Sequence, residues 1–417
     1  MIISSKLLVP VTSPPSADSA LVIRDEKIVA VGHREEIVKK YPGEEMRDYR
    51  QGVILPGLIN LHTHLEYTAL QGLQEPAPFL DWLDNLIMRS KKFSAKDWGE
   101  SYKNGIEELK RCGVTTVVDV ARRGAGLEDL VASGLRGISC IEFVAVDDSH
   151  LLSAGEELKR TLDSALTTTQ GTKVQIGLAP HSVYTLSQNA LSFVAKLSRE
   201  KDLFLTIHLA ESRAESELII HGRGPLVDFL SRYQLDTVPP GGCGMSSTAY
   251  LRECGILDNR LVASHGVWVD DEDLKLLRDR GVGIALCVRS NHFLKNGRAP
   301  LEQIKSQGIH FGIGTDSLAS NSSLDLFEEL RFFKSRYQGF SDEELLKMIT
   351  ISSAEALGMS EMIGSIEKGK RADLVVMQLK RTVDPSEVFQ YLIDEGGRED
   401  ALLSLVDGKV IFERGEA

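Results

Sequence analysis

The sequence has few cysteines, and none of them belongs to a Cys-x-x-Cys pair. They occupy scattered positions: Cys112, Cys140, Cys243, Cys254 and Cys287. An odd set with this spacing indicates neither a disulfide framework nor a zinc site made of cysteines. We therefore expect a protein of the reducing cytoplasm.

Long apolar runs and an excess of positive charge are also missing. No run of about 18 apolar residues occurs, and no charged segment leads into an apolar one at the start, so we expect neither a membrane span nor export. The formal net charge is -12. Nucleic acids and anionic membranes are bound through clustered Lys and Arg, so both are disfavoured as partners. The expected partner is a small-molecule substrate, and a homodimer is left open.

What the chain does contain is a repeated alternation of short apolar runs with longer amphipathic stretches, as in βα units. Eight candidate strands can be identified, at residues 54–61, 115–120, 139–146, 174–178, 204–208, 261–265, 283–287 and 310–314. Eight parallel strands close a (β/α)8 TIM barrel, so the predicted fold class is α/β.

The two chain ends show a different pattern, in which apolar and polar residues alternate as in hairpins. One hairpin is predicted over 20–31 and another over 403–412, where Asp407-Gly408 favours a tight turn. We predict that both ends jointly form a small β-sandwich. The predicted domains are residues 1–56 and 363–417 for the sandwich and 57–362 for the barrel.

Two segments are assigned to loops or turns. The stretch 239–247 is rich in Pro, Gly and Ser and is expected to be a loop in the fifth βα unit. Residues 364–371 have the spacing of a phosphate-binding loop, but Arg371 stands where a Ser or Thr must ligate magnesium. This second segment is interpreted as a turn into the last strands.

Histidines and a carboxylate stand at the ends of several predicted strands, where barrel enzymes build their sites. His62 and His64 end the first strand, and residues i and i+2 point to the same face. His208 ends the fifth strand and Asp316 follows the eighth. Three imidazoles and one carboxylate suit zinc, while iron or manganese would also fit.

Three further polar residues follow strand ends. Glu211 lies beyond His208 and could hydrogen-bond a substrate, although it could also be an acid at a helix start. His265 could accept a proton from a metal-bound water, and His181 could contact a substrate. For both histidines the alternative is a buried structural role.

Several segments resemble the diagnostic segments of the amidohydrolase superfamily, in the group of S-adenosylhomocysteine deaminases, guanine deaminases and triazine chlorohydrolases. They cover nearly the whole chain in order: Leu-Pro-Gly-Leu-Ile-Asn-Leu-His-Thr-His at 55–64, Pro-His-Ser-Val-Tyr-Thr at 180–185, His-Leu-Ala-Glu at 208–211, Ser-His-Gly-Val at 264–267, Gly-Thr-Asp-Ser at 314–317, and Gly-Ser-Ile-Glu-Lys-Gly-Lys-Arg-Ala-Asp-Leu at 364–374.

The resemblance implies a metal-dependent hydrolytic deaminase. His62, His64, His208 and Asp316 would be the metal ligands. No Lys ends the fourth strand, where binuclear relatives place a carbamylated lysine, so a single divalent metal is expected. A bound metal lowers the pKa of water from about 15.7 towards ~7. Glu211 would then donate a proton to a ring nitrogen, while His265 and Asp316 would accept the proton of the attacking water.

Two departures from the common pattern point to a substrate. Glu66 follows the metal histidines where many relatives have small residues, and Arg289 stands where Thr is usual. The pattern is most similar to aminodeoxyfutalosine deaminases of the alternative menaquinone pathway, whose substrate combines adenine, ribose and benzoate. The resemblance implies that Glu66 meets the sugar or base and Arg289 the carboxylate. Alternatively, Glu66 caps a helix and Arg289 pairs with a neighbouring acid.

Other functions of the same group stay open. The substrate could be S-adenosylhomocysteine, methylthioadenosine or a guanine-type base, or the reaction could be the dechlorination of a triazine. Outside the enzymes, some barrel relatives have lost their metals and act as structural scaffolds. The complete set of ligands disfavours that last alternative, because a scaffold has no use for histidines at several strand ends.

Overall fold

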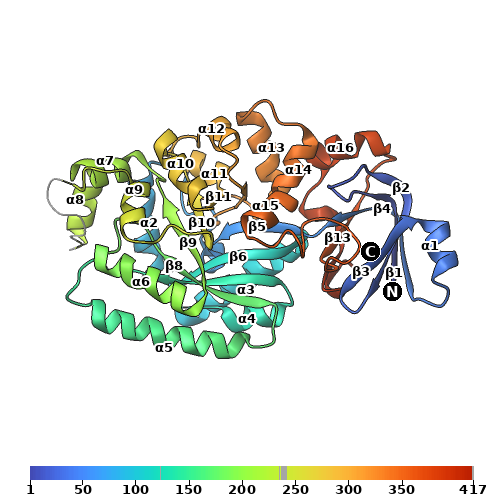
Figure 1. Ribbon diagram of the computed structural model, residues 1–417, viewed down its shortest axis with the longest axis horizontal. Coiled ribbons are helices and arrows are strands. Elements are labelled where there is room, and N and C mark those ends of the chain that lie inside the picture. The colour runs from blue at the N-terminus through green and yellow to red at the C-terminus, as the bar shows by residue number, and fades with distance from the viewer. Residues whose placement is uncertain (123, 234, 236–241, 416–417) are drawn as a thin grey trace.

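Eight parallel strands form the centre of the larger part of the molecule (Figure 1). The structure, a computed structural model, describes residues 1–122, 124–233, 235 and 242–415. The strands hydrogen-bond in the order β12-β11-β10-β9-β8-β7-β6-β5. Their bounds are β5 (Leu58–Thr63), β6 (Val114–Arg122), β7 (Arg136–Phe143), β8 (Val174–Pro180), β9 (Phe204–Leu209), β10 (Leu261–His265), β11 (Gly283–Leu286) and β12 (Phe311–Ile313).

The first and last strands of this sheet meet, so the sheet is a nearly closed barrel. The backbone N–H of Asp316 donates to the carbonyl of His62 at 2.9 Å, and Thr63 pairs with Asp316 as an isolated parallel bridge. The strands are almost entirely buried because helices cover the outside of a parallel sheet. The predicted α/β barrel is confirmed.

Helices follow most barrel strands, and several begin with clear N-terminal signals. Capping boxes start three of them, at Ser94, Asp270 and Ser341. The helices of this part are η1 (Leu65–Leu70), α2 (Phe79–Ser90), α3 (Ala95–Arg111), α4 (Leu127–Ser133), α5 (Leu151–Thr169), α6 (Gln188–Lys201), α7 (Arg213–His221), α8 (Pro225–Arg232), α9 (Ser247–Glu253), α10 (Asp271–Asp279), α11 (Val288–Phe293), α12 (Leu301–Ser306), α13 (Leu326–Arg336), α14 (Asp342–Met348) and α15 (Ile351–Ala356).

Both chain ends form a second sheet beside the barrel, where the N and C labels lie close together (Figure 1). Its strand order is β15-β14-β13-β4-β1-β2-β3. The elements are β1 (Ile2–Leu8), β2 (Ser16–Arg24), β3 (Lys27–His33), α1 (Arg34–Lys40), β4 (Met46–Pro56), β13 (Leu374–Gln378), η2 (Pro385–Glu387), α16 (Val388–Glu395), η3 (Arg398–Asp400), β14 (Ala401–Val406) and β15 (Lys409–Glu413).

This second sheet folds over an apolar cluster of its own. Ile3 of β1, Ile28 of β3, Leu374 of β13 and Leu405 of β14 all belong to that cluster. The predicted hairpins are present as the antiparallel pairs β2–β3 and β14–β15. The joint β-domain of the two chain ends is therefore confirmed, with its strands joined in one hydrogen-bonded series.

The predicted bounds 54–61 of the first barrel strand are wrong, because this run is shared by two strands. Residues up to Pro56 belong to β4 of the second sheet, and the barrel strand β5 begins at Leu58. Gly57 separates them and lies so close to Thr115 that a Cβ atom would stand 2.0 Å from its Oγ1. Apolar residues on both sides of Gly57 make the two strands look like one, although the predicted domain limit lies between residues 56 and 57.

The two segments assigned to loops have different outcomes. Of the expected loop at 239–247, residues 239–241 lie outside the described residues, 242–246 form no helix or strand, and Ser247 begins α9. The segment 364–371 turns back against the N-terminal hairpin, where Gly369 N–H donates to the carbonyl of Ile28. Within the described ranges, no helix is long and apolar enough to span a membrane.

Candidate active site

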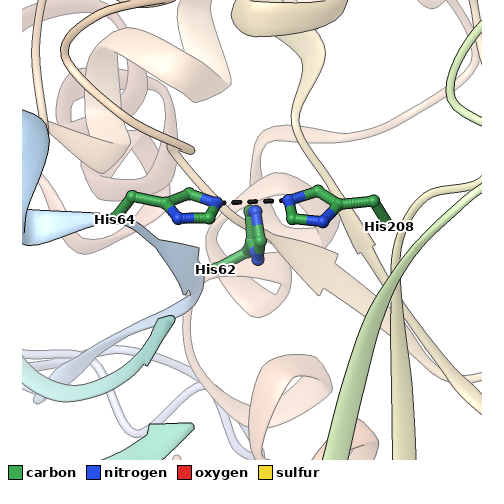
Figure 2. Close-up of side chains that lie close together, drawn as sticks. All are labelled: His62, His64 and His208. Carbon is green, nitrogen blue, oxygen red and sulfur yellow. Dashed lines mark hydrogen bonds between the residues drawn. The ribbon is translucent and has the colours of Figure 1, made fainter. Parts of the chain in front are cut away.

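The predicted metal ligands converge at the carboxyl ends of the barrel strands. His62 and His64 come from the end of β5, His208 from β9, and Asp316 follows β12. All four side chains are buried. Figure 2 shows His64 and His208 facing each other with His62 pointing between them.

The spacing of the nitrogen and oxygen atoms fits a single small cation. His64 Nε2 and His208 Nε2 are 3.2 Å apart, and Asp316 Oδ1 lies 3.7 Å from both His62 Nε2 and His64 Nε2. Ligands at ~2.0–2.1 Å in a tetrahedral site are about 3.3 Å from one another. His62 Nε2 is buried and has no hydrogen-bond partner among the described residues, as a metal-binding nitrogen would require.

Neighbouring groups hold these side chains in the orientation that a metal needs. His208 Nδ1 donates to the carbonyl of His181 at 2.7 Å, which leaves the lone pair on Nε2. The Nδ1 atom of His62 is hydrogen-bonded to the Ser264 hydroxyl at 2.9 Å. The Asp316 carboxylate accepts from the hydroxyl of Ser290 at 2.6 Å.

The protonation states also suit a cation. Burial lowers the pKa of His64 to about 3 and that of His208 to about 4, so both rings are neutral. Burial and the neighbouring imidazoles hold the pKa of His62 well below its usual value. Burial opposes ionisation of Asp316, but His62 and His64 outweigh it and keep that pKa below its ordinary range. Neutral imidazoles with one carboxylate form a ligand set for a divalent metal.

The chain bends sharply where two of the site residues project. His265 has a φ of 74° and Asp316 a φ of 59°, both in the left-handed region that side chains other than glycine rarely adopt. Such backbone conformations persist where the surrounding structure enforces them, and they are common at functional sites.

Glu211 and His265 form the second part of the site, with Glu211 Oε1 and His265 Nε2 3.9 Å apart. Burial raises the pKa of Glu211 to about 7, which leaves a protonated fraction at neutral pH. Asn296 donates to Glu211 Oε1 at 3.0 Å. His265 Nδ1 donates to Asn291 Oδ1 at 2.9 Å, so its Nε2 carries a lone pair, and burial lowers its pKa. The pair can supply one acid and one base.

His181 lies beside the metal ligands and faces the same cavity. Its ring centroid is 4.9 Å from that of His208. The Nδ1 atom is hydrogen-bonded to the Thr185 hydroxyl at 3.0 Å, and no partner in the described chain engages Nε2. Burial lowers the pKa of His181 to about 4. A neutral ring with one free nitrogen is suited to a substrate contact.

A cavity of about 470 Å³ opens over these groups. His64, His181, His208, Glu211, His265 and Asp316 line its floor. Its walls are mostly apolar and come from Tyr67, Phe79, Trp82, Leu86, Ile87 and Phe229. This volume and lining are typical of a small-molecule site.

Glu66 does not line the cavity but supports a residue that does. Its carboxylate accepts from Nε of Arg122 at 2.9 Å and from the backbone N–H of Arg122 at 3.2 Å. Glu66 is buried, and the guanidinium of Arg122 lies 4.5 Å above the ring of Trp98. Glu66 thus lies behind Arg122, so its predicted contact with substrate has no support from this geometry.

Arg289 is likewise not brought into the cavity. It pairs with Glu328 at 2.7 Å and lies 3.9 Å from Glu329, both on α13. A hydrogen bond also joins it to the Ser322 hydroxyl. This arrangement matches the alternative expectation, in which Arg289 pairs with a neighbouring acid.

Several residues of the site were not predicted from the sequence. Arg122 and Glu142 line the cavity at the ends of β6 and β7. Barrel enzymes place their functional residues at the carboxyl ends of the strands. The polar residue at the end of each of these two strands could therefore have predicted both positions. Asn291 and Asn296 follow β11 in a segment without a distinctive spacing. No sequence signal singles these two out.

A profile of the family described as "Amidohydrolase family" matches residues 53–409. The chain belongs to the amidohydrolase family. The match confirms the predicted enzyme class and spans the barrel together with the strands that return to the second sheet. A second profile, described as an imidazolonepropionase-like composite domain of bacteria, matches residues 20–43.

Individual relatives and structures agree with this assignment. The 5-methylthioadenosine/S-adenosylhomocysteine deaminase of Pyrococcus furiosus is 31% identical and covers 96% of this chain and 93% of its own length. A zinc-bound adenosine deaminase from Xanthomonas campestris superimposes with a TM-score of 0.83 at 24% identity, covering 98% and 92% of the two chains. Helicobacter pylori aminofutalosine deaminase has a TM-score of 0.85 at 22% identity, covering 99% and 100%. At these identities the two structures show the shared fold.

Proposed function

We propose that this enzyme hydrolytically removes the amino group from the adenine ring of a nucleoside. The observation that carries the proposal is the buried pair of Glu211 and His265 beside four residues that could bind a metal, at the floor of an otherwise apolar cavity. The relatives named as methylthioadenosine and S-adenosylhomocysteine deaminases support the same substrate class.

The residues divide the work as follows. His62, His64, His208 and Asp316 would hold one divalent metal, for which we propose zinc, and the metal would lower the pKa of a water molecule. Glu211 donates a proton to the ring nitrogen next to the amino-bearing carbon. The water oxygen bonds to the amino-bearing carbon, and His265 and Asp316 take up the proton that the water loses. That proton passes to the amino group, the carbon–nitrogen bond breaks, and ammonia leaves. The proton remaining on the oxygen restores the acid form of Glu211, and the ring carbon keeps the oxygen as a carbonyl.

The test is release of ammonia by the metal-loaded enzyme from a panel of substrates. Adenosine, 5′-methylthioadenosine, S-adenosylhomocysteine and aminodeoxyfutalosine should release ammonia, whereas guanine should not. A chlorotriazine separates the rival reaction, since dechlorination would release chloride. Turnover of the triazine or guanine without any turnover of an adenine nucleoside would contradict the proposal.

For the substituent at the 5′ carbon we propose the aryl carboxylate of aminodeoxyfutalosine, from the alternative menaquinone pathway. The aromatic and aliphatic cavity walls suit an aryl group, and Lys91 at the end of α2 lines the same cavity. Lys91, rather than Arg289, is then the cation that meets the carboxylate.

Two variants separate these assignments. Lys91→Met should lower kcat/KM for aminodeoxyfutalosine about 10-fold, the smaller effect expected of a hydrogen bond to a charged group, and should spare 5′-methylthioadenosine. Arg289→Met is the matched comparison and should affect both substrates alike. If Arg289→Met instead lowered kcat/KM only for aminodeoxyfutalosine, Arg289 would be the residue that binds the carboxylate.

A further inference from the structure

Arg122 and Glu142 form a pair of polar residues inside the cavity that the proposed chemistry does not use. They face each other in register on the neighbouring parallel strands β6 and β7, at the carboxyl ends of both. Side chains in register on adjacent strands point to the same face of the sheet. Both residues line the cavity above the metal ligands.

Arg122 is held firmly in place. Glu66 fixes its Nε and its backbone N–H, and the guanidinium lies over the rings of Trp98 and Tyr67 at 4.5 Å and 5.5 Å. The side chain nevertheless remains 38% exposed. Within the described ranges, no acceptor engages its two terminal nitrogens, so the guanidinium offers donors to the cavity.

Glu142 offers the complementary acceptors. No group in the described part of the chain donates a hydrogen bond to its carboxyl, and no ion pair within 4.0 Å joins it to Arg122. The positive charge of Arg122 acts on the Glu142 carboxyl across the gap between them. A donor and an acceptor therefore stand side by side near the reacting end of the cavity, separated by more than ion-pair distance.

The charges of Arg122, Glu142 and Glu66 determine which kind of ligand group can bind there. An anionic group would be attracted by Arg122 but repelled by the carboxylates of Glu142 and Glu66. A cationic group would be repelled by Arg122. A hydroxyl both donates and accepts, so two neighbouring hydroxyls can donate to Glu142 and accept from Arg122 without any charge conflict.

We propose, on the basis of the proposed adenine-nucleoside substrate, that Arg122 and Glu142 bind the 2′ and 3′ hydroxyls of the ribose. Glu66 acts through Arg122 as a positioning residue. The pair makes the enzyme selective for ribonucleosides over deoxynucleosides and over the free base.

The experiment compares adenosine with 2′-deoxyadenosine and 3′-deoxyadenosine on the metal-loaded enzyme. Removing a hydroxyl that bonds to a charged group should lower kcat/KM about 10- to 150-fold in the wild type. Glu142→Gln and Arg122→Met should each lower kcat/KM for adenosine towards the deoxynucleoside values while changing the deoxynucleoside values little. Metal content should stay at the wild-type level. Glu156→Gln, an exposed change on α5, is the matched control and should preserve the discrimination.

Each possible outcome either supports or overturns the ribose site. Loss of discrimination in the variants, with metal retained, supports the ribose site. Equal wild-type rates on adenosine and both deoxynucleosides would overturn it while leaving adenine deamination intact. Equal losses on all three substrates would show a merely structural role and would also overturn it. If no adenine nucleoside releases ammonia, the proposed function and the ribose site fall together.

Discussion

His62, His208 and Asp316 are each oriented by a hydrogen bond on the side that faces away from the other ligands. Ser264, the carbonyl of His181 and Ser290 supply those bonds. Such partners fix the ring tautomer and the direction of the lone pair. Their loss typically weakens metal binding about 10- to 100-fold. These bonds hold the three side chains in the orientation that the proposed metal would need.

Asp316→Asn should weaken metal retention and activity together. The change removes the negative charge that stabilises the cation, while the shape of the side chain is kept. Elemental analysis per chain and the rate of metal loss to a chelator are the measurements, with Asp279→Asn on the exposed face of α10 as the control. We expect one metal per wild-type chain. Wild-type chains that reproducibly hold two metals, or an Asp316→Asn protein as resistant to chelator as the wild type, would contradict this ligand set.

Glu211→Gln should retain the metal but lose turnover. An amide cannot deliver the proton that we propose Glu211 donates, and general acid catalysis is typically worth ~10²–10⁴ in rate. Metal content and kcat/KM are measured on the same sample. Glu217→Gln, at a partly exposed residue of α7, is the matched control and should match the wild type. If activity fell only in proportion to metal loss, Glu211 would be a ligand or a structural group.

At the scale of elements, burial of a carboxylate on α13 links helix packing to pH. Glu329 accepts from Asn321 at 2.6 Å and lies under Arg289, and burial raises its pKa from 4.5 to about 7. The fold therefore favours the protonated form. Its stabilising contribution is complete below pH 4.5 and is lost as the pH rises through about 7.

Glu329→Gln should consequently flatten the pH dependence of stability. The wild type should lose roughly 3 kcal/mol more than the variant as the pH rises from 4.5 to 8, since one pKa unit corresponds to about 1.4 kcal/mol. Urea unfolding of both proteins across this range measures the difference. Other buried acids contribute equally to both proteins and cancel. Parallel curves for the two proteins would mean that Glu329 stays ionised in the fold.

The elements that could be predicted from the sequence are those with a local signal. Alternating residues and Asp407-Gly408 predict the hairpin β14–β15, and apolar runs predict the barrel strands. The predicted domain boundary lies between residues 56 and 57, but the strand predicted over 54–61 runs across it, because apolar residues continue from one sheet into the other.

At the candidate site, local sequence signals predict the proposed metal ligands but not the residues that pair with Glu66 and Arg289. His62 and His64 lie two residues apart on one strand, a spacing that places both rings on one face. The partners of Glu66 and Arg289 lie 56 and 39 residues away in the chain. Neither pairing leaves a local pattern in the sequence. Only the folded chain therefore shows that Glu66 supports Arg122 and that Arg289 pairs with Glu328.

At the scale of the whole molecule, a buried cluster of charges joins the barrel to the sheet of the chain ends. Arg136 begins β7 and donates to Asp373 through Nε at 2.7 Å and through Nη2 at 3.0 Å. The same Nη2 donates to Asp407 at 2.7 Å. Arg136, Asp373 and Asp407 are all buried. The segment 364–374, whose early part has the spacing of a phosphate loop, ends at this cluster.

Arg136→Met should destabilise the protein by roughly 3–5 kcal/mol, because it removes the buried cation that the carboxylates of Asp373 and Asp407 share. Arg136 lies at the opposite end of β7 from the cavity residue Glu142, so kcat/KM and metal content at 25 °C should stay near the wild-type values while the urea midpoint falls. Lys159→Met, which removes an exposed ion pair on α5, should change stability by only about 0–1 kcal/mol. A stable Arg136→Met protein would show that the other cations near Asp407, Lys173 and Arg371, suffice to hold the sheet on the barrel. Loss of activity without loss of stability would instead place a connection between this cluster and the site along β7.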